Sequence, residues 1–249
     1  MAQVLSEKLR ETLLDMLKTV DWFCEENGIR YFLSFESLLG AVRKNGLISW
    51  QNYISLVMPR NDYERFVVSF KTLKEYRLYT FQNESSYYYP YAQIKIDNIL
   101  KDDVIKLESN CVYLNVVPLD NLSDNLQIAQ KMAVLIEKKK KSLNRSRKLW
   151  EFSPISKKND PDNTKSLLAK RMRRLMEQID KECRAFRSNE FSDYVTAVCS
   201  DRPGSNEILN SEWFKDYKTI PFEYIEARIP IGYEELLKKL YVNYENMPV

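Results

Sequence analysis

The stretch that decides the fold runs from residue 27 to residue 66 and reads NGIRYFLSFESLLGAVRKNGLISWQNYISLVMPRNDYERF. Two short apolar runs in it, residues 29–33 and 53–58, have the length and the Val, Ile, Tyr and Phe content of strands. The segments after them favour helices, because Ser34 and Asn61 each suit the N-cap of a helix that follows. We therefore expect an alternation of strand and helix, with the helices over residues 37–44 and 62–73.

The rest of the chain changes character near residue 125. Before that point we expect a helix over residues 4–26 and further strands over residues 76–81, 87–96 and 111–117. After it the strand signals vanish, and we expect helices over residues 127–150, 164–186 and 233–244, with residues 188–232 irregular and containing only short elements. The sequence predicts an α+β protein with a mixed core over residues 1–124 and a mainly helical part over residues 125–249.

Composition excludes several kinds of active site. The 249 residues contain no histidine, so a Ser-His-Asp triad and a histidine zinc site are both impossible. Only five glycines are present, and none belongs to a P-loop or a G-x-G-x-x-G turn. The four cysteines lie far apart and form no C-x-x-C pair, so we interpret them as buried apolar residues.

Charge and hydropathy point to a cytoplasmic location. The net charge is only +3, and no apolar run reaches the length of about 18 residues that spans a bilayer. The N-terminus lacks the pattern of a secretory signal. The basic run over residues 138–148 is open to three interpretations, namely a solvated helix face, a nucleic-acid contact or an anionic membrane contact. Few aromatic residues interleave with it, so we expect no nucleic acid and at most peripheral membrane contact.

The 27–66 stretch closely resembles the LicD-type phosphocholine transferase family, a branch of the nucleotidyltransferase fold. The shared pattern includes LLGAVR at residues 38–43 and the MPRxDYExF run that begins at Met58. Two further segments resemble the family: YLNVVPLD at 113–120 and PIGYEELLKKLY at 230–241. The resemblance implies a nucleotidyltransferase-type mixed sheet flanked by helices, with a helical C-terminal part.

The resemblance also implies a chemistry. Enzymes of this fold place a D-x-D pair on one strand and a third carboxylate on a neighbouring strand. Residues i and i+2 of a strand share a face, so these carboxylates converge. They hold Mg²⁺, which bridges to the phosphates of a nucleotide donor. The family implies transfer of phosphocholine or a related phospho-group to a cell-surface glycan, which suggests a nucleotide-linked donor, a surface glycan or an active paralogue as partners.

The sequence departs from the family at the metal ligands. The D-x-D positions align with Tyr53 and Ser55, and the third carboxylate aligns with Asn115. All three replacements are neutral, so we expect no bound metal and no cofactor. A glycine pair of the family is replaced here by Phe35 and Glu36. Glu36 is the possible substitute acid, although a surface or capping carboxylate explains it more simply.

Five residues at matched positions are candidates for substrate binding: Ser34, Ser37, Arg43, Trp50 and Arg60. Ser34 also suits the N-cap of the helix that follows it. The two arginines suit phosphate or carboxylate recognition, or alternatively structural salt bridges. The tyrosines of residues 87–91 suggest either a cation-binding aromatic box or the alternating faces of a strand, and the strand is the simpler interpretation.

Three hypotheses about function remain open at this point. The first is a catalytically impaired or silent family member that binds a glycan, a nucleotide or an active partner. The second is a working transferase that uses Glu36 or an unaligned acid with a different metal arrangement. The third is a redesigned sequence on this scaffold, without activity. The neutral residues at Tyr53, Ser55 and Asn115 favour the first.

Overall fold

The fold is seen in a computed structural model that describes residues 7–49, 51–96, 112–152, 164–188, 190–198, 208–241 and 243–247. The chain forms two compact units. Unit 1 contains residues 1–79, 92–119 and 209–249, and unit 2 contains residues 80–91 and 120–208. Each unit is therefore assembled from segments that lie far apart in the sequence.

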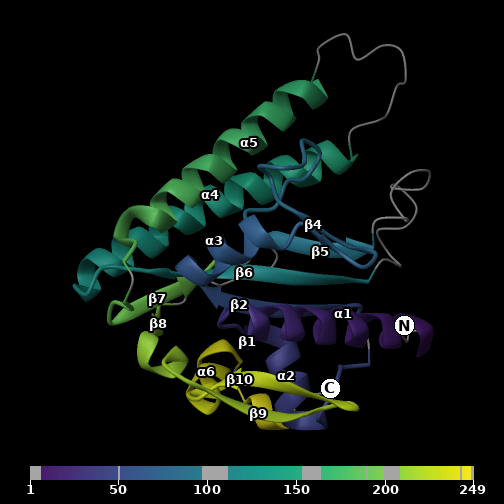
Figure 1. The fold of residues 1–249 in the computed structure, drawn as a ribbon. Helices are drawn as coiled ribbons and strands as arrows, with labels where there is room; N and C mark the ends of the chain where they lie inside the picture. The colour runs from purple at the N-terminus through teal and green to yellow at the C-terminus, as the bar shows by residue number, and fades with distance from the viewer. Residues whose placement is uncertain are drawn as a thin grey trace. The chain divides into compact units, whose positions relative to one another are not determined.

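A mixed sheet forms the centre of unit 1 (Figure 1). Its strands follow the spatial order β1 (Phe32–Leu33), β2 (Tyr53–Pro59), β6 (Tyr113–Asn121), β5 (Ala92–Ile96), β4 (Tyr76–Tyr79) and β3 (Thr72–Leu73). The pair β2 and β6 is parallel, and the other pairs are antiparallel. The two central strands are almost wholly buried, so the sheet provides the core on which the helices pack.

Helices and a second, two-stranded sheet complete unit 1. The helices are α1 (Glu7–Glu26), α2 (Phe35–Lys44), α3 (Arg60–Ser69) and α6 (Tyr233–Leu240), with short 3₁₀ turns η3 (Ser211–Phe214) and η4 (Tyr244–Asn246). A hairpin of β9 (Tyr217–Phe222) and β10 (Ile225–Pro230) contacts β1. The strand β8 (Leu209–Asn210) also belongs to this unit.

Apolar spacing explains how α1 packs. Leu13, Leu17, Val20 and Cys24 recur on one side of the helix and are fully buried. Phe23 makes edge-to-face contacts with the rings of α3 and the residue after it, at centroid distances of 5.1–5.7 Å. The helix predicted over residues 4–26 is therefore observed from Glu7 to Glu26, and its first residues lie outside the described part.

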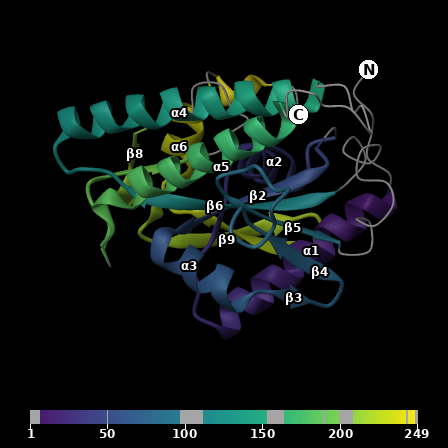
Figure 2. The same cartoon turned by 90° about the horizontal axis from the view of Figure 1, so that it is seen from above.

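Unit 2 is built on two long antiparallel helices, α4 (Leu126–Phe152) and α5 (Thr164–Cys183), which lie side by side in both views (Figures 1 and 2). Lys139 of α4 donates to Glu182 of α5 at 2.8 Å. The 3₁₀ turn η2 (Arg184–Phe186) and the strand β7 (Tyr194–Ala197) follow. Cys24 in unit 1 and Cys183 in unit 2 are buried, as predicted, whereas Cys111 and Cys199 lie outside the described residues.

The α+β class predicted from the sequence is confirmed, with a mixed sheet flanked by helices. Some boundaries differ. The helix predicted to end at residue 73 ends at Ser69, because residues 72–73 form a strand that turns back at Lys74, whose φ is 56°. The tyrosines of residues 87–91 precede β5 and are not part of a strand.

The strand predicted to end before Pro118 runs on to Asn121. Proline lacks the N–H that a ladder bond needs. The pairing with β5 ends at Val116, two residues before Pro118. The proline therefore leaves no bond to β5 unmade.

The prediction that strands are absent after residue 125 is wrong. Residues 194–230, expected to be irregular, contain four strands, and the hairpin of β9 and β10 is the longest of these elements. Charged residues and Pro221 hide its alternation, in which Ala227 and Ile229 are buried while Glu226 and Arg228 are more exposed. The domain boundary at residues 124 and 125 stays a prediction.

Among the described residues, no helix has both the length and the apolar character needed to cross a bilayer.

Candidate functional site

The three positions aligned with the family's carboxylates, Tyr53, Ser55 and Asn115, lie on one face of the central sheet. Ser55 of β2 pairs in register with Asn115 of β6, and Tyr53 pairs with Tyr113. Asn115 is also the partner of Gln93 on β5. Alternate residues of a strand share a face, so this face carries two rows of side chains that run across the strands. The first row passes through Ser55 and the second through Tyr53.

The first row, Ser55, Asn115 and Gln93, is a chain of hydrogen bonds. The Gln93 Nε2 donates to Asn115 Oδ1 at 2.8 Å, and Asn115 Nδ2 donates to Ser55 Oγ at 3.2 Å. All three residues are buried. The amides and the hydroxyl bond to one another where the resembled family has charged ligands.

Helix α2 contributes Ser37 to this row. Its Oγ accepts a hydrogen bond from Gln51 Nε2 at 2.7 Å and another from the backbone N of Ser55 at 2.9 Å. Ser37 is fully buried, and Gln51 is almost so. Two acceptor atoms, Gln51 Oε1 and Gln93 Oε1, are buried with no hydrogen-bond partner among the described residues. The cluster thus presents neutral acceptors and no charge of its own.

The second row is aromatic and basic. The rings of Tyr53 and Tyr113 stack with centroids 5.5 Å apart and planes 13° apart. The Nζ of Lys95 lies 5.9 Å from the centroid of Tyr113. Lys95 follows Gln93 by two residues on β5, so it shares the face of the first row. A cation therefore stands on the face where the family pattern places acids.

This donor set does not fit a divalent metal. Mg²⁺ needs hard oxygen ligands that carry charge, and it tolerates a neighbouring ammonium poorly. The face offers two amides, hydroxyls and Lys95 instead. Among the described residues, no three Asp, Glu, His or Cys side chains group in a way that could hold a metal ion.

The turn before α2 keeps a geometry that normally needs glycine. Phe35 has a φ of 53°, a left-handed conformation that a bulky L-residue rarely adopts. Phe35 is nevertheless buried. Its neighbour Ser34 is the N-cap, but the Ser34 side chain makes no cap hydrogen bond, and its N donates to Ser55 O at 2.9 Å. Glu36 lies half-buried in the first turn of α2, which suits a carboxylate.

The motif arginines have contacts inside unit 1. The Nη1 of Arg43 donates to the backbone oxygens of Tyr244 and Met247, the latter at 3.2 Å, so this side chain holds the C-terminal segment. Arg60 is 7% exposed, and its guanidinium lies 5.4 Å from the ring centroid of Tyr63. Trp50, the remaining candidate, lies outside the described residues.

Gly40 of the LLGAVR motif has a packing reason to be glycine. A Cβ there would collide with the carbonyl oxygen of Gly46. The N–H of Gly46 in turn donates to Gly40 O at 3.3 Å. The motif glycine thus allows the backbone after α2 to fold back closely on the helix.

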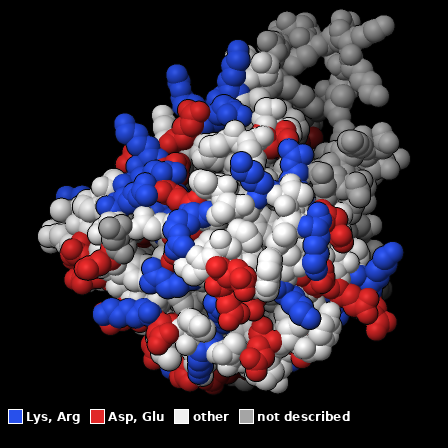
Figure 3. Space-filling view, in the orientation of Figure 1, with Lys and Arg blue, Asp and Glu red and all other residues white. Residues whose placement is uncertain are grey.

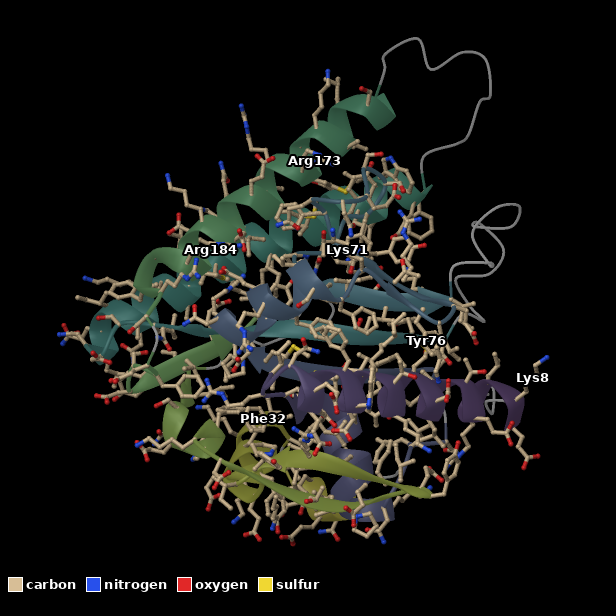
Figure 4. All side chains as sticks on the ribbon, viewed as in Figure 1. Lys8, Phe32, Lys71, Tyr76, Arg173 and Arg184 are labelled. Carbon is tan, nitrogen blue, oxygen red and sulfur yellow. The ribbon has the colours of Figure 1, made fainter. Side chains whose placement is uncertain are left out.

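Shifted pKa values are found around α1. A hydrogen bond from the Tyr76 phenol lowers the pKa of Asp15, and burial raises the pKa of Tyr76 itself (Figure 4). Burial also raises the pKa values of Tyr31 and Cys24. Tyr31 donates to Asp21 at 2.8 Å, so these groups tie α1 to its neighbours.

Sequence analysis missed Gln93, Lys95 and Tyr113 as members of this face. The alternation of Gln93 and Lys95 in the sequence indicates that the two share one face of a strand. It does not reveal which strand lies beside it. The register of Gln93 against Asn115 comes from pairing between segments 22 residues apart.

Comparison with known proteins finds similarity to one family. Residues 28–118 match the family model described as LicD/FKTN/FKRP, nucleotidyltransferase domain. The chain is also 26% identical over 251 residues to the lipopolysaccharide cholinephosphotransferase LicD of Haemophilus influenzae, an alignment that covers 96% of this chain and 92% of that protein. The matched range contains Tyr53, Ser55 and Asn115, and the resemblance to the LicD family seen in the sequence is confirmed.

Proposed function

We propose that this protein acts in the modification of cell-surface glycans by phosphocholine or a related phospho-group, without metal-dependent transfer of its own. The first part is supported by the likeness to a lipopolysaccharide cholinephosphotransferase along nearly the whole chain. The second part is supported by one observation, the neutral row of Ser55, Asn115 and Gln93 beside Lys95.

The chemical reason is charge. A phosphoryl group in transfer carries developing negative charge, which a bound metal normally neutralises. A hydroxyl and two amides cannot hold that metal, because they do not offset its charge. The residues of a catalytic site act together. Replacing three of them therefore removes about as much of the rate acceleration as removing the whole site.

A protein of this kind would bind rather than transfer. The candidate ligands are a nucleotide-linked donor, the surface glycan or an active paralogue, and the proposed location is cytoplasmic. The orphaned acceptors Gln51 Oε1 and Gln93 Oε1 suit a ligand that donates hydrogen bonds, such as a sugar hydroxyl or an amino group.

The test compares the natural chain with a variant in which the carboxylates are restored, Tyr53→Asp/Ser55→Asp/Asn115→Asp. Thermal unfolding is measured with and without Mn²⁺, and heat is measured when a cytidine diphosphate-linked choline donor is added with the metal. We expect no metal-dependent change for the natural chain. In the variant the buried carboxylates repel one another, so Mn²⁺ should raise its melting temperature clearly.

Glu36→Gln is the matched control for the competing hypothesis. Metal-dependent turnover of the donor by the natural chain that Glu36→Gln abolishes would establish a working transferase with a rearranged site. A restored variant that folds but shows no response to Mn²⁺ would contradict the assignment of the three positions. Neither result depends on knowing the glycan.

A further inference from the structure

One end of the helical hairpin in unit 2 collects positive charge. We call this the hairpin end and define it as residues 138–152 of α4 with residues 167–174 of α5. The two segments are neighbours, because Arg171 Nη2 donates to Ser142 Oγ at 3.1 Å. Lys and Arg side chains gather along α5 in Figure 3, and Arg173 marks this end of the helix in Figure 4.

The charge of the hairpin end contrasts with the rest of the chain. Its two segments hold eleven Lys and Arg residues and one acid, Glu151, so their formal charge is +10 (11 minus 1). Two of these lysines, Lys139 and Lys140, pair with Glu182 and Glu137 outside the segments. The whole chain has a net charge of +3, so all other residues together carry −7 (3 minus 10). The acids of α5 lie in its other half, at Glu177, Asp180 and Glu182.

Helical spacing puts many of these cations on one exposed stripe of α4. The exposed residues recur at intervals of three and four along the helix, and they are Lys131, Val134, Lys138, Lys141, Arg145, Lys148, Leu149 and Phe152. Lys138, Arg145 and Lys148 form no ion pair with any described residue, and Glu151 is held by Arg147 at 3.7 Å. The stripe is therefore open to an anionic partner.

Large apolar side chains share this surface. Leu149 is 61% exposed, Phe152 is 83% exposed and Leu167 of α5 is 59% exposed. Trp150 lies between the first two in the sequence, and its ring contacts Tyr88 at a centroid distance of 5.4 Å. Exposed apolar residues that lie together among polar side chains are typical of an interaction surface.

We propose that the hairpin end is a docking surface for an anionic lipid bilayer. Its lysines and arginines attract the lipid headgroups, while Leu149, Phe152 and Leu167 enter the boundary between headgroups and acyl chains. The combination of clustered cations with exposed aliphatic and aromatic residues is typical of helices that lie in the membrane interface. This inference goes beyond the proposed function, since it concerns unit 2 and none of the residues of the sheet face.

The same surface fits nucleic acid less well. Nucleic-acid surfaces pair cations with rings that stack on bases, and they gain little from leucine. Tyr89, the other half-buried tyrosine near this end, already has the guanidinium of Arg147 at 4.4 Å from its ring centroid. The apolar residues therefore decide in favour of lipid.

The experiment is co-sedimentation of the full chain with large vesicles. One set is made of phosphatidylcholine alone and the other of phosphatidylcholine mixed with phosphatidylglycerol. We expect binding only to the mixed vesicles, and weaker binding as the salt concentration rises, because exposed charges are screened. A duplex oligonucleotide of matched total charge serves as the competing partner.

Two variants separate the charge from the apolar contribution. Arg145→Gln/Lys148→Gln/Arg174→Gln should weaken vesicle binding about a hundredfold, because each cation near an anionic surface contributes about fivefold. Leu149→Ser/Phe152→Ser should weaken it at least about tenfold through the lost apolar area. Lys8→Gln/Lys71→Gln/Lys238→Gln removes the same charge from exposed positions of unit 1 and should leave binding unchanged.

Three results would overturn the proposal. Equal binding to both vesicle types rules out charge recognition, and equal loss in the unit 1 control shows a non-specific charge effect. Oligonucleotide binding that is tighter than vesicle binding and insensitive to Leu149→Ser/Phe152→Ser assigns the surface to nucleic acid. Circular dichroism of each variant checks that the substituted positions, all exposed, leave the helices intact.

Discussion

At the scale of single residues, the buried hydroxyls and amides around Ser55 form a polar cluster. Ser37, which the sequence marks as a candidate for substrate binding, connects α2 to β2 through two hydrogen bonds to its Oγ. Ser34, the N-cap of the same helix α2, is also buried, but its side chain makes no cap hydrogen bond. The two buried serines, three residues apart, are therefore expected to contribute differently to the free energy of unfolding.

Ser37→Ala tests that difference. The substitution leaves the donors of Gln51 Nε2 and Ser55 N buried without their acceptor, so we expect a loss of about 2–4 kcal/mol in the free energy of unfolding. Ser34→Ala is the matched control and should cost less than about 1 kcal/mol. Urea unfolding at an unchanged m-value measures both. Equal costs would mean that the Ser37 bonds are replaced by water.

At the scale of elements, α4 shows how one run of similar residues divides. The run of Lys138, Lys139, Lys140 and Lys141 looks uniform in the sequence. In the helix, Lys139 pairs with Glu182 of α5, and Lys140 is buried with its Nζ 2.9 Å from Glu137 Oε2. The turn of 100° per residue sends neighbouring lysines in different directions. Lys139 and Lys140 are thus held in ion pairs within the fold.

The contribution of the buried ion pair of Glu137 and Lys140 to stability can be measured by substitution. Removing one partner leaves a buried charge uncompensated, so Glu137→Gln should cost about 3–5 kcal/mol. The double variant Glu137→Gln/Lys140→Met removes both charges, and we expect it to be clearly more stable than the single variant. Thermal unfolding of both proteins measures this. A double variant that is less stable than Glu137→Gln would show that the pair stabilises unit 2 outright.

At the scale of the whole molecule, unit 1 closes around its own C-terminal residues. Arg228 of β10 lies 3.0 Å from Asp21 of α1, and Glu223 accepts from the N of Leu47 at 2.8 Å. Phe214 packs edge-to-face on Phe32 of β1 with centroids 5.8 Å apart. Figure 4 shows Phe32 on the side of β1 that faces the hairpin of β9 and β10. The last 41 residues of the chain, 209–249, therefore complete the core of unit 1.

A fragment of residues 1–124 should consequently fail to fold. It keeps the sheet strands but exposes the faces that Phe214, Ala227 and Ile229 bury. We expect weak near-ultraviolet circular dichroism and no cooperative urea transition, in contrast to the full chain. A fragment that unfolds cooperatively would instead support the domain boundary predicted near residue 124.

The amount that could be predicted differs between these scales. Local patterns were enough for α1, α2 and β2, because apolar periodicity and turn residues act over a few positions. The hairpin of β9 and β10 was missed, since its alternation is interrupted by charged residues that are exposed at the edge of a small sheet. The extension of β6 through Pro118 depends on where β5 ends, which no local pattern contains.

The sequence by itself determined the α+β class, the family resemblance and the identity of the three neutral replacements, because these are properties of residue order. Only the tertiary structure decided what stands around them. The register of β5 against β6 brings Gln93 to Asn115 and Lys95 to the stacked tyrosines, and the fold of the C-terminal segment turns Arg43 into its anchor. Pairing between distant segments is set by the packing of the whole unit, and for that reason the character of the face, polar and basic instead of acidic, could be seen only once the chain was folded.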